Sequence, residues 1–227
     1  MTTCDQYGNT DINGKIYVVQ NGMWNPSPGG TQCLSVDNVT GAYTVTTQTN
    51  ISTNGSPASY PFIYQGCHFG YCTTGSDLPL QVGKIKTAQS SWSVTTISTG
   101  VWNVAFDIWI NTTPTTPNGA DGAEIMIWLN SRSMTPYGHN EGTTLVSGSP
   151  WSVTHTKFDV PFIVYRSKTD LASVSNLGIK AFLDDAVSRG WIESDWYLIS
   201  VEAGFELWSG GEGMRTNSFS FTASSIP

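Results

Sequence analysis

Alternation of apolar and polar residues is the feature that most restricts how this chain can fold. Nine segments show a period of two, which is the pattern of strands with one buried face. They are Ile16–Val19, Tyr43–Thr47, Trp92–Ile97, Trp102–Ile110, Glu124–Asn130, Trp151–Phe158, Phe162–Arg166, Tyr197–Trp208 and Ser218–Thr222. Asn-Gly, Pro-Gly and Gly-Ser pairs between them predict turns. The pattern predicts an all-β sandwich of antiparallel sheets.

One segment departs from this alternation. Between Leu177 and Arg189, apolar residues recur at Ile179, Phe182, Leu183, Ala186 and Val187, which is one face of a helix. Asn176 is the expected N-cap and Gly190 the expected C-terminal stop. We therefore expect a single helix packed on the outside of the sandwich.

The length and charge of the chain narrow its organisation and its partners. The 227 residues contain no linker, so we expect one domain over residues 1–227. A net charge of −7 argues against nucleic acids and anionic membranes, which need a basic face. No run of 18 apolar residues is present, so we expect no membrane span. A neutral polymer is the partner that fits best.

The four cysteines predict two disulfides. Cys67 and Cys72 are close enough for a local bridge, and Cys4 and Cys33 would then tie down the N-terminal segment. Free thiols or a metal site are the alternatives, but the spacing lacks the paired Cys-x-x-Cys of zinc sites. Disulfides indicate an oxidising compartment, and we expect a secreted, extracellular protein.

Three strands carry acids and tryptophans on one face. Alternation places Glu124, Met126 and Trp128 on the same side of their strand, opposite the isoleucines. A second strand groups Glu202, Gly204, Glu206 and Trp208, and a third groups Asn103, Ala105, Asp107 and Trp109. Gly204 is expected to leave room for a ligand beside Glu206. A Glu at a strand end beside a half-buried Trp explains any one strand, but the recurrence on three indicates a site.

Paired carboxyl groups among aromatic side chains suit glycosidic bond cleavage. One carboxylic acid protonates the leaving oxygen, while a second carboxylate attacks the anomeric carbon or activates water. Aromatic rings provide flat surfaces for sugars. A Ser/His/Asp hydrolase is disfavoured because the chain has no Gly-x-Ser-x-Gly motif. No catalytic metal or other cofactor is expected, because the chain has no His-x-x-x-His motif and no carboxylate cluster with ligand spacing, whereas structural calcium stays an open alternative.

Six segments carry a resemblance to a known family. In order they are Val19–Asn25, Tyr60-Pro61 with Gly66–Cys72, Phe106–Trp109, Glu124–Leu129, Asp195–Leu198 and Ala203–Trp208. The chain resembles glycoside hydrolase family 12, the endo-β-1,4-glucanases with a compact β-jelly-roll fold. Glu-Ile-Met-Ile-Trp and Gly-Phe-Glu-Leu-Trp are specific in combination. The resemblance implies a jelly-roll sandwich with one helix outside, and a retaining cellulase that acts on β-glucan.

The resemblance also implies a role for each matching residue. Glu124 corresponds to the nucleophile, Glu206 to the general acid and base, and Asp107 to an acid that tunes the nucleophile. Trp24 corresponds to a sugar-stacking platform on the non-reducing side of the cleft, although on the residues alone a core tryptophan is the favoured interpretation. The other expected substrate-binding residues are Tyr7, His68, Met126, Trp128, Pro136 and Gly138, with His68 near the acid/base.

This sequence departs from the family pattern at three places. Gly22 replaces a common Asn, and Thr135-Pro-Tyr-Gly138 replaces Gln-Pro-Ile/Val-Gly in the cord expected to cross the cleft. Tyr137 is therefore expected to restrict or enrich the positive subsites. Glu202 replaces a common Gln, and we expect it to raise the pKa of Glu206 if the two are close.

Alternative functions remain open at this stage. A non-catalytic glucan-binding, lectin-like module would also use aromatic faces, but it gains little from paired glutamates. A xylanase of a related jelly-roll family, or a xyloglucanase, would use the same pair of acids. We expect the protein to act as a monomer.

Overall fold

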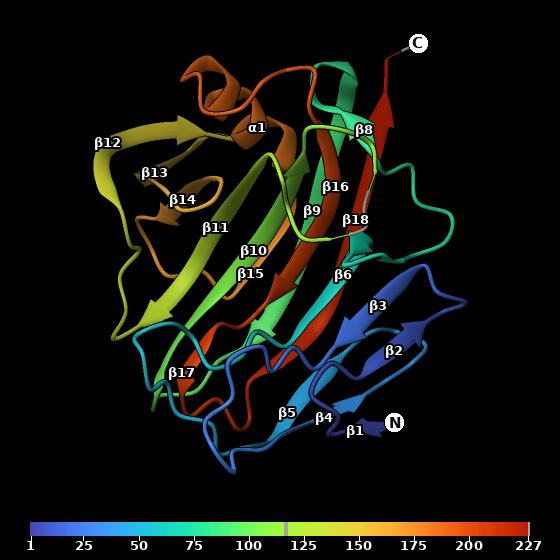
Figure 1. Ribbon diagram of the computed structural model, residues 1–227, viewed down its shortest axis with the longest axis vertical. Coiled ribbons are helices and arrows are strands. Elements are labelled where there is room, and N and C mark those ends of the chain that lie inside the picture. The colour runs from blue at the N-terminus through green and yellow to red at the C-terminus, as the bar shows by residue number, and fades with distance from the viewer. Residues whose placement is uncertain (116–117, 227) are drawn as a thin grey trace.

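The computed structural model, which describes residues 1–115 and 118–226, consists of two β-sheets packed face to face (Figure 1). The smaller sheet has six strands, in the order β1 (Thr2–Thr3), β4 (Gln32–Val36), β5 (Tyr43–Gln48), β18 (Arg215–Ser225), β9 (Ile85–Thr95) and β15 (Ser173–Gly178). Together with the larger sheet, described next, it forms the expected β-jelly-roll.

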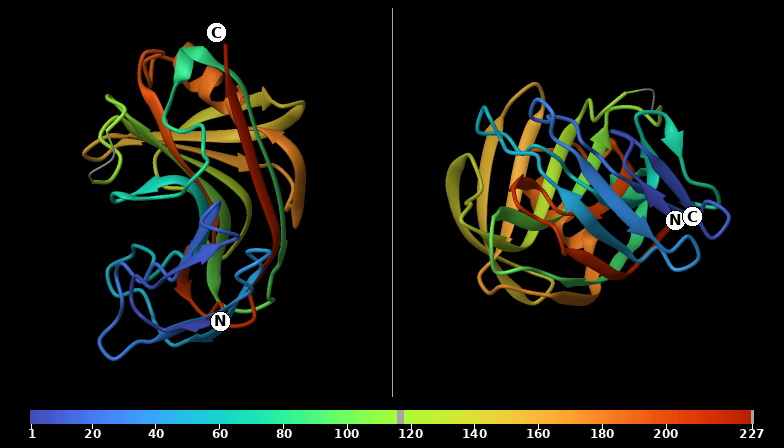
Figure 2. Two further views of the ribbon diagram at one scale, coloured as in Figure 1. Left: turned by 90° about the vertical axis from the view of Figure 1, so that its right-hand side faces the viewer. Right: turned by 90° about the horizontal axis from the view of Figure 1, so that it is seen from below.

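The larger sheet has twelve strands. Nine of them lie in the order β12 (His139–Val146), β13 (Ser149–Lys157), β14 (Pro161–Ser167), β11 (Ala123–Arg132), β10 (Val101–Asn111), β16 (Tyr197–Gly204), β6 (Phe62–His68), β3 (Tyr17–Gln20) and β2 (Asn9–Ile12). Short strands β17 (Leu207–Ser209), β7 (Tyr71–Cys72) and β8 (Leu80–Gln81) pair with β10, β6 and β16. A 3₁₀ turn, η1, covers Val82–Lys84. The sheet is strongly bent, so it has a concave and a convex face (Figure 2).

All nine predicted strands form, with two corrections. The segment Tyr197–Trp208 is divided into β16 and β17, with Phe205 and Glu206 between them. The sheets are antiparallel in every described pair except β11 and β14, which run parallel. Strand β6 was not predicted because all but its last residue are buried, so its sequence does not alternate.

The core lies between the convex face of the larger sheet and the inner face of the smaller one. Trp92 on β9 reaches across it, with its ring centroid 5.1 Å from that of Phe106 on β10 and 6.0 Å from that of Phe205. Its indole donates a hydrogen bond to Thr216 Oγ1 at 3.2 Å, so the polar nitrogen is satisfied inside the core. The apolar faces predicted for the acid-bearing strands all enter this core.

Helix α1 (Ile179–Ser188) extends the core, and its predicted apolar face is correct. Phe182 packs edge-on against Trp151 on β13 and Tyr165 on β14, with centroids 5.0 and 5.1 Å apart. The predicted N-cap is wrong: Gly178 is the N-cap, while Asn176 belongs to β15 with φ 51°. Gly190 follows the helix with φ 70°, a conformation in which glycine is not strained, as expected for a helix stop.

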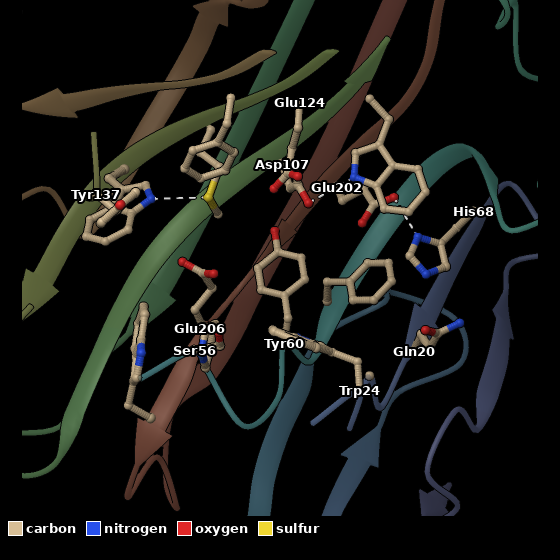
Figure 3. A pocket seen from close by; sticks show the side chains of 18 of the residues that line it. Gln20, Trp24, Ser56, Tyr60, His68, Asp107, Glu124, Tyr137, Glu202 and Glu206 are labelled. Atoms are coloured by element: carbon tan, nitrogen blue, oxygen red, sulfur yellow. Dashed lines mark hydrogen bonds and ion pairs between the residues drawn. The ribbon is translucent and has the colours of Figure 1, made fainter. Parts of the chain in front are cut away.

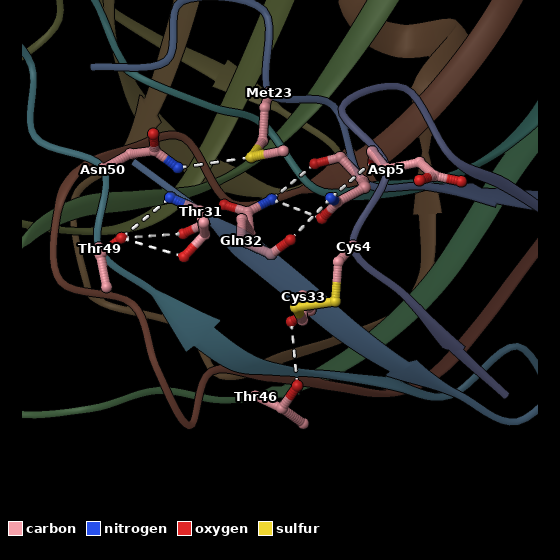
Figure 4. Close-up of a disulfide and its surroundings, with 10 residues drawn as sticks. Cys4, Asp5, Met23, Thr31, Gln32, Cys33, Thr46, Thr49 and Asn50 are labelled. Atoms are coloured by element: carbon pink, nitrogen blue, oxygen red, sulfur yellow. Dashed lines mark hydrogen bonds between the residues drawn. A yellow bond between two sulfur atoms is a disulfide. The ribbon is translucent and has the colours of Figure 1, made fainter. Parts of the chain in front are cut away.

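Both predicted disulfides form. Cys67–Cys72 closes the β6–β7 turn, and Cys4–Cys33 ties the segment before β2 to β4 (Figure 4). Beside the second bridge, the buried Gln32 amide donates to Asn21 O at 2.6 Å and its oxygen accepts from Ser59 Oγ at 2.6 Å. These bonds fix the loop that follows β3, which carries Trp24. In the described ranges, no helix is long and apolar enough to cross a bilayer.

Gly204 is required by strand packing and not by a ligand, which corrects the expectation from sequence. A Cβ at this position would lie 2.4 Å from Pro61 O and 2.7 Å from Phe62 Cβ, both on the neighbouring β6 side. The space beside Gly204 is therefore filled by the protein's own backbone.

We predict that Gly204→Ala destabilises the protein by roughly 1–3 kcal/mol, because the added methyl group must displace backbone atoms. The measurement is the free energy of unfolding in denaturant. Gly119→Ala is the matched control, since a Cβ there meets Phe69 at an ordinary 3.4 Å. Equal stability of the two variants would contradict the packing argument.

Candidate active site

A cleft of about 1160 Å³ occupies the concave face of the larger sheet (Figure 3). The predicted polar-aromatic faces of β10, β11 and the β16–β17 segment meet in it, at Asp107, Trp109, Glu124, Met126, Trp128, Glu202, Glu206 and Trp208. Four carboxyl groups therefore share one largely apolar cavity. Figure 3 shows Glu206 on one side of the cleft floor and the other three acids gathered opposite it.

Strand register brings the acids together. On β10, Trp109 lies opposite Glu124 of β11, and Asp107 lies opposite Glu202 of β16. Side chains of directly opposed residues on one face are neighbours in a sheet. Residues distant in sequence thus become a compact group through pairing of three adjacent strands.

Glu206 lies at the break between β16 and β17 and is held by Asn103. The Asn103 amide nitrogen donates to Glu206 Oε2, while Asn103 Oδ1 accepts from the Glu206 backbone N–H at 3.1 Å. The Asn103 backbone N–H also donates to Glu206 O at 3.0 Å. Asn103 was placed on the correct face by alternation, but its contact with Glu206 was missed because register is not visible in sequence.

Burial raises the pKa of both predicted catalytic glutamates. The pKa of Glu206 rises to about 8, mainly by desolvation and further by the charge of Glu124, against the hydrogen bond from Asn103. The pKa of Glu124 rises to about 7, first by desolvation and then by the charge of Glu202. At neutral pH, Glu206 retains its proton more strongly than Glu124 does.

Asp107 lies fully inside the cleft wall. Desolvation raises the pKa of Asp107 well above its usual value, and the charges of Glu124 and Glu202 raise it further. Trp109 Nε1 donates to its Oδ2 at 2.9 Å, whereas the buried Oδ1 has no hydrogen-bond partner among the residues that the structure describes. The raised pKa favours the protonated form of Asp107, which adds no charge beside Glu124.

Glu202 is wholly buried, and its partners correct two expectations. Its Oε1 lies 2.9 Å from His68 Nδ1 and accepts a hydrogen bond from Ser200 Oγ at 2.9 Å. His68 therefore contacts Glu202 and not Glu206. Glu202 raises the pKa of Glu124 and Asp107, whereas the charge that raises the pKa of Glu206 is that of Glu124.

Most of the predicted substrate-binding residues line the cleft. They are Tyr7, Trp24, His68, Met126, Trp128 and Pro136. Trp24 is 48% exposed, so the interpretation as a core tryptophan is wrong. Gly138 does not line the cleft: with φ 128° it carries the chain past β13, where a Cβ would lie 2.9 Å from His155 O.

Sequence reasoning missed several aromatic residues of the cleft. They are Tyr60, Phe62, Phe69, Tyr71, Phe158 and Phe162. Tyr60 and Phe62 stack with centroids 5.1 Å apart, and Tyr60 OH donates to Ala105 O at 2.9 Å, which joins the cleft floor to β10. The available signal was the run of aromatics around Tyr60, but its direction depends on how β6 pairs.

Comparison with known proteins assigns the family. The family model for glycosyl hydrolase family 12 matches residues 15–224. The chain belongs to glycosyl hydrolase family 12. A metagenome-derived family 12 endoglucanase is 42% identical, with a TM-score of 0.96 over 100% of this chain and 98% of that one. Endoglucanase Cel12A from Rhodothermus marinus is 41% identical, with a TM-score of 0.95 over 100% of both chains.

A relative found by sequence supports the same family assignment. A probable cellulase, Cel12b of Mycobacterium tuberculosis, is 34% identical over 147 residues, which are 64% of this chain and 97% of that protein. The present protein, as a member of family 12, is an endo-β-1,4-glucanase that hydrolyses β-glucans with retention of configuration. The chain is therefore an enzyme, and the alternative of a non-catalytic binding module is wrong.

We predict that Glu124→Gln stabilises the fold, and more strongly at higher pH. Glu124 has a folded pKa of about 7 against 4.5 for the unfolded chain, so the native state loses stability as pH rises between these values. A neutral amide removes this loss, and the gain should reach roughly 3 kcal/mol near pH 8 and be small near pH 4. Thermal unfolding of both proteins across this pH range measures it.

Glu193→Gln is the control for this prediction, because Glu193 is exposed. It should leave the pH dependence of unfolding unchanged. A stability gain in Glu124→Gln that does not grow with pH would show that the carboxylate is not destabilised by its surroundings.

We also predict that Asn103→Ala moves the alkaline limb of the kcat/KM profile to higher pH. The lost hydrogen bond favours the ionised form of Glu206, so its removal raises the pKa of this group. Initial rates on a soluble β-glucan across pH measure the shift. Gln20→Ala is the control, since Gln20 lines the cleft but donates to Asn9. An alkaline limb that stays in place would contradict the expectation that this limb reports the ionisation of Glu206.

Proposed function

We propose that Glu124 is the nucleophile and Glu206 the general acid and base of the retaining hydrolysis. The observation that carries this proposal is geometric: Glu206, held by Asn103, lies on one side of the cleft floor, and Glu124 lies on the other side with Asp107 and Glu202 (Figure 3). The pKa of Glu206 is raised to about 8 and that of Glu124 to about 7, so the protonated acid and the ionised nucleophile coexist near neutral pH.

The reaction proceeds in two displacements. Glu206 donates its proton to the glycosidic oxygen while the Glu124 carboxylate attacks the anomeric carbon, which breaks the C–O bond and releases the first product. Glu206, now ionised, takes a proton from water, whose oxygen displaces Glu124 from the anomeric carbon. The second product leaves, and both glutamates return to their starting forms.

Asp107 is proposed to tune this cycle without contacting the bond that breaks. Its raised pKa keeps it neutral, so it adds no negative charge beside the forming ester of Glu124. Trp109 fixes its orientation through the 2.9 Å hydrogen bond to Oδ2. Such a neutral neighbour lowers the cost of ionising Glu124 before attack.

The shape of the cleft supports endo-cleavage. Lining residues extend from Tyr7 and Trp24 at the β2–β3 edge to Pro136 and Tyr137 at the β12–β13 edge. A glucan chain longer than the catalytic centre fits along such a groove. We propose that Trp24 and Tyr7 stack on sugars, that Met126 and Trp128 form the floor beside Glu124, and that Pro136 covers the chain.

The cellular setting is also a proposal. Two disulfides support secretion into an oxidising medium, where a polysaccharide substrate is found. One core spans both sheets, which supports a single catalytic domain over residues 1–227. We propose that this domain acts as a monomer.

External azide tests the two roles separately. With an aryl β-cellobioside whose leaving group needs no protonation, Glu206→Ala should still form the glycosyl–enzyme, and azide should restore turnover by attacking it in place of water. The product is the β-glycosyl azide. Glu124→Ala should give the α-glycosyl azide, because azide then attacks the substrate directly from the vacant nucleophile side. Proton NMR distinguishes the anomers.

The outcomes separate the alternatives. Opposite anomers in the two variants support the assignment, and exchanged anomers would reverse the roles of Glu124 and Glu206. Wild-type turnover in Glu124→Ala without azide would remove this residue from the mechanism. Glu193→Ala, at an exposed position outside the cleft, controls for general effects of losing a carboxylate.

A further inference from the structure

Two exposed aromatic rings stand at the β12–β13 edge of the cleft. Tyr137 is 70% exposed and Phe158 is 60% exposed, yet their rings lie nearly parallel, with centroids 5.8 Å apart and 17° between planes. Phe162 continues the row, with its centroid 5.4 Å from that of Phe158. All three residues line the cleft. The row is a continuous apolar surface open to solvent.

This row begins beside the catalytic centre. Phe162 on β14 is the direct partner of Glu124 on β11 in the parallel pair. Phe158 follows β13, and Tyr137 lies on the connection between β11 and β12. The rings therefore lead outward from Glu124 over the edge of the sheet that is opposite β2 and β3. Figure 3 shows Tyr137 and Trp24 on different sides of the four acids.

The backbone that carries the outer rings is fixed in place. Thr154 Oγ1 donates to Tyr137 O at 3.4 Å, and the Phe158 backbone N–H donates to Val160 O at 3.1 Å in the turn after β13. Gly138 lets the chain pass closely over His155. A backbone held in this way reduces the conformational freedom that these residues must lose when a flat ligand binds, which favours binding.

Packing within the fold does not account for this arrangement. Neither Tyr137 nor Phe158 belongs to the hydrophobic clusters of buried residues, and both leave most of their surface in water. Large apolar groups gathered on a surface mark a binding site more often than a structural one. The occupant must present a flat apolar face, and it must extend from the catalytic centre.

We infer that Tyr137, Phe158 and Phe162 form a sugar-binding platform for a β-1,4-linked glucan chain, at the end of the cleft opposite Trp24. A β-glucopyranose ring directs its hydroxyl groups outward in the ring plane and leaves C–H groups on both faces, so it matches an aromatic surface. The inference rests on the proposed function, since the chain must cross the catalytic centre to reach both ends. The platform gives the cleft a second anchoring point.

Bond selection in a short oligosaccharide tests this inference. In cellohexaose labelled at its reducing end, the position of cleavage reports how the chain sits in the groove. Loss of binding at one end lets the chain shift toward the other end. Tyr137→Ala and Phe158→Ala should therefore move the preferred cleavage position in one direction along the chain, and Trp24→Ala should move it in the opposite direction. The kcat/KM on cellohexaose should fall roughly three- to tenfold in each.

Two control variants isolate the ring. Tyr137→Phe keeps the aromatic face and should therefore keep the wild-type cleavage position in cellohexaose, which Tyr137→Ala loses. Leu145→Ala removes a side chain that is 76% exposed on β12 but does not line the cleft, and it should also have no effect. Loss of binding in Tyr137→Phe equal to that in Tyr137→Ala would assign the effect to the hydroxyl group and overturn stacking.

Failure of the inference is distinguishable from failure of the proposed function. A wild-type enzyme that does not cleave cellohexaose would contradict the function itself. A wild-type enzyme that cleaves it, with Tyr137→Ala and Phe158→Ala selecting the same bonds at the same rate, would overturn the platform alone. A shift in the same direction as that of Trp24→Ala would also overturn it, because the rings would then not lie at the opposite end.

Discussion

The structure depends on one electrostatic constraint: four carboxyl groups share a single apolar cleft and cannot all be charged together. Asp107, Glu124 and Glu202 lie on three adjacent strands, and Glu206 faces them. Desolvation is the largest cause of the raised pKa in Asp107, Glu124 and Glu206, and mutual repulsion adds to it. The order in which these groups lose their protons is thus set by how deeply each carboxyl group is buried, by its hydrogen bonds and by the charges beside it.

The contacts differ in a way that separates the acids. Asn103 gives Glu206 a donor, Trp109 gives Asp107 a donor, and His68 with Ser200 surrounds one oxygen of Glu202. Each donor fixes one carboxyl group in position. A site of this kind costs stability at the pH where it works, because its groups would ionise more easily in the unfolded chain. The large shared core and two disulfides offset this cost.

Sequence alternation predicted the faces of the strands but not their pairing. It placed Glu124, Met126 and Trp128 together, and it separated Glu206 from Phe205, because a period of two follows from strand geometry alone. It could not show that Asn103 meets Glu206 or that His68 meets Glu202. The first pair is separated by 103 positions in the sequence and the second pair by 134. Gly204 was misinterpreted for the same reason: the atoms that exclude a Cβ come from another strand.

The two ends of the cleft are built independently of its centre. At the β2–β3 edge, the loop with Trp24 is held by Asn21 and Gln32 beside a disulfide. At the other edge, the Tyr137 backbone carbonyl accepts a hydrogen bond from Thr154 Oγ1 on β13, and Gly138 passes close to His155. Neither anchor contacts the four carboxyl groups of the cleft, so a substitution at either edge leaves the contacts that set their pKa values in place. Because Tyr137 lies at such an edge, its proposed contact with the substrate can be separated by mutation from the proposed catalytic roles of Glu124 and Glu206.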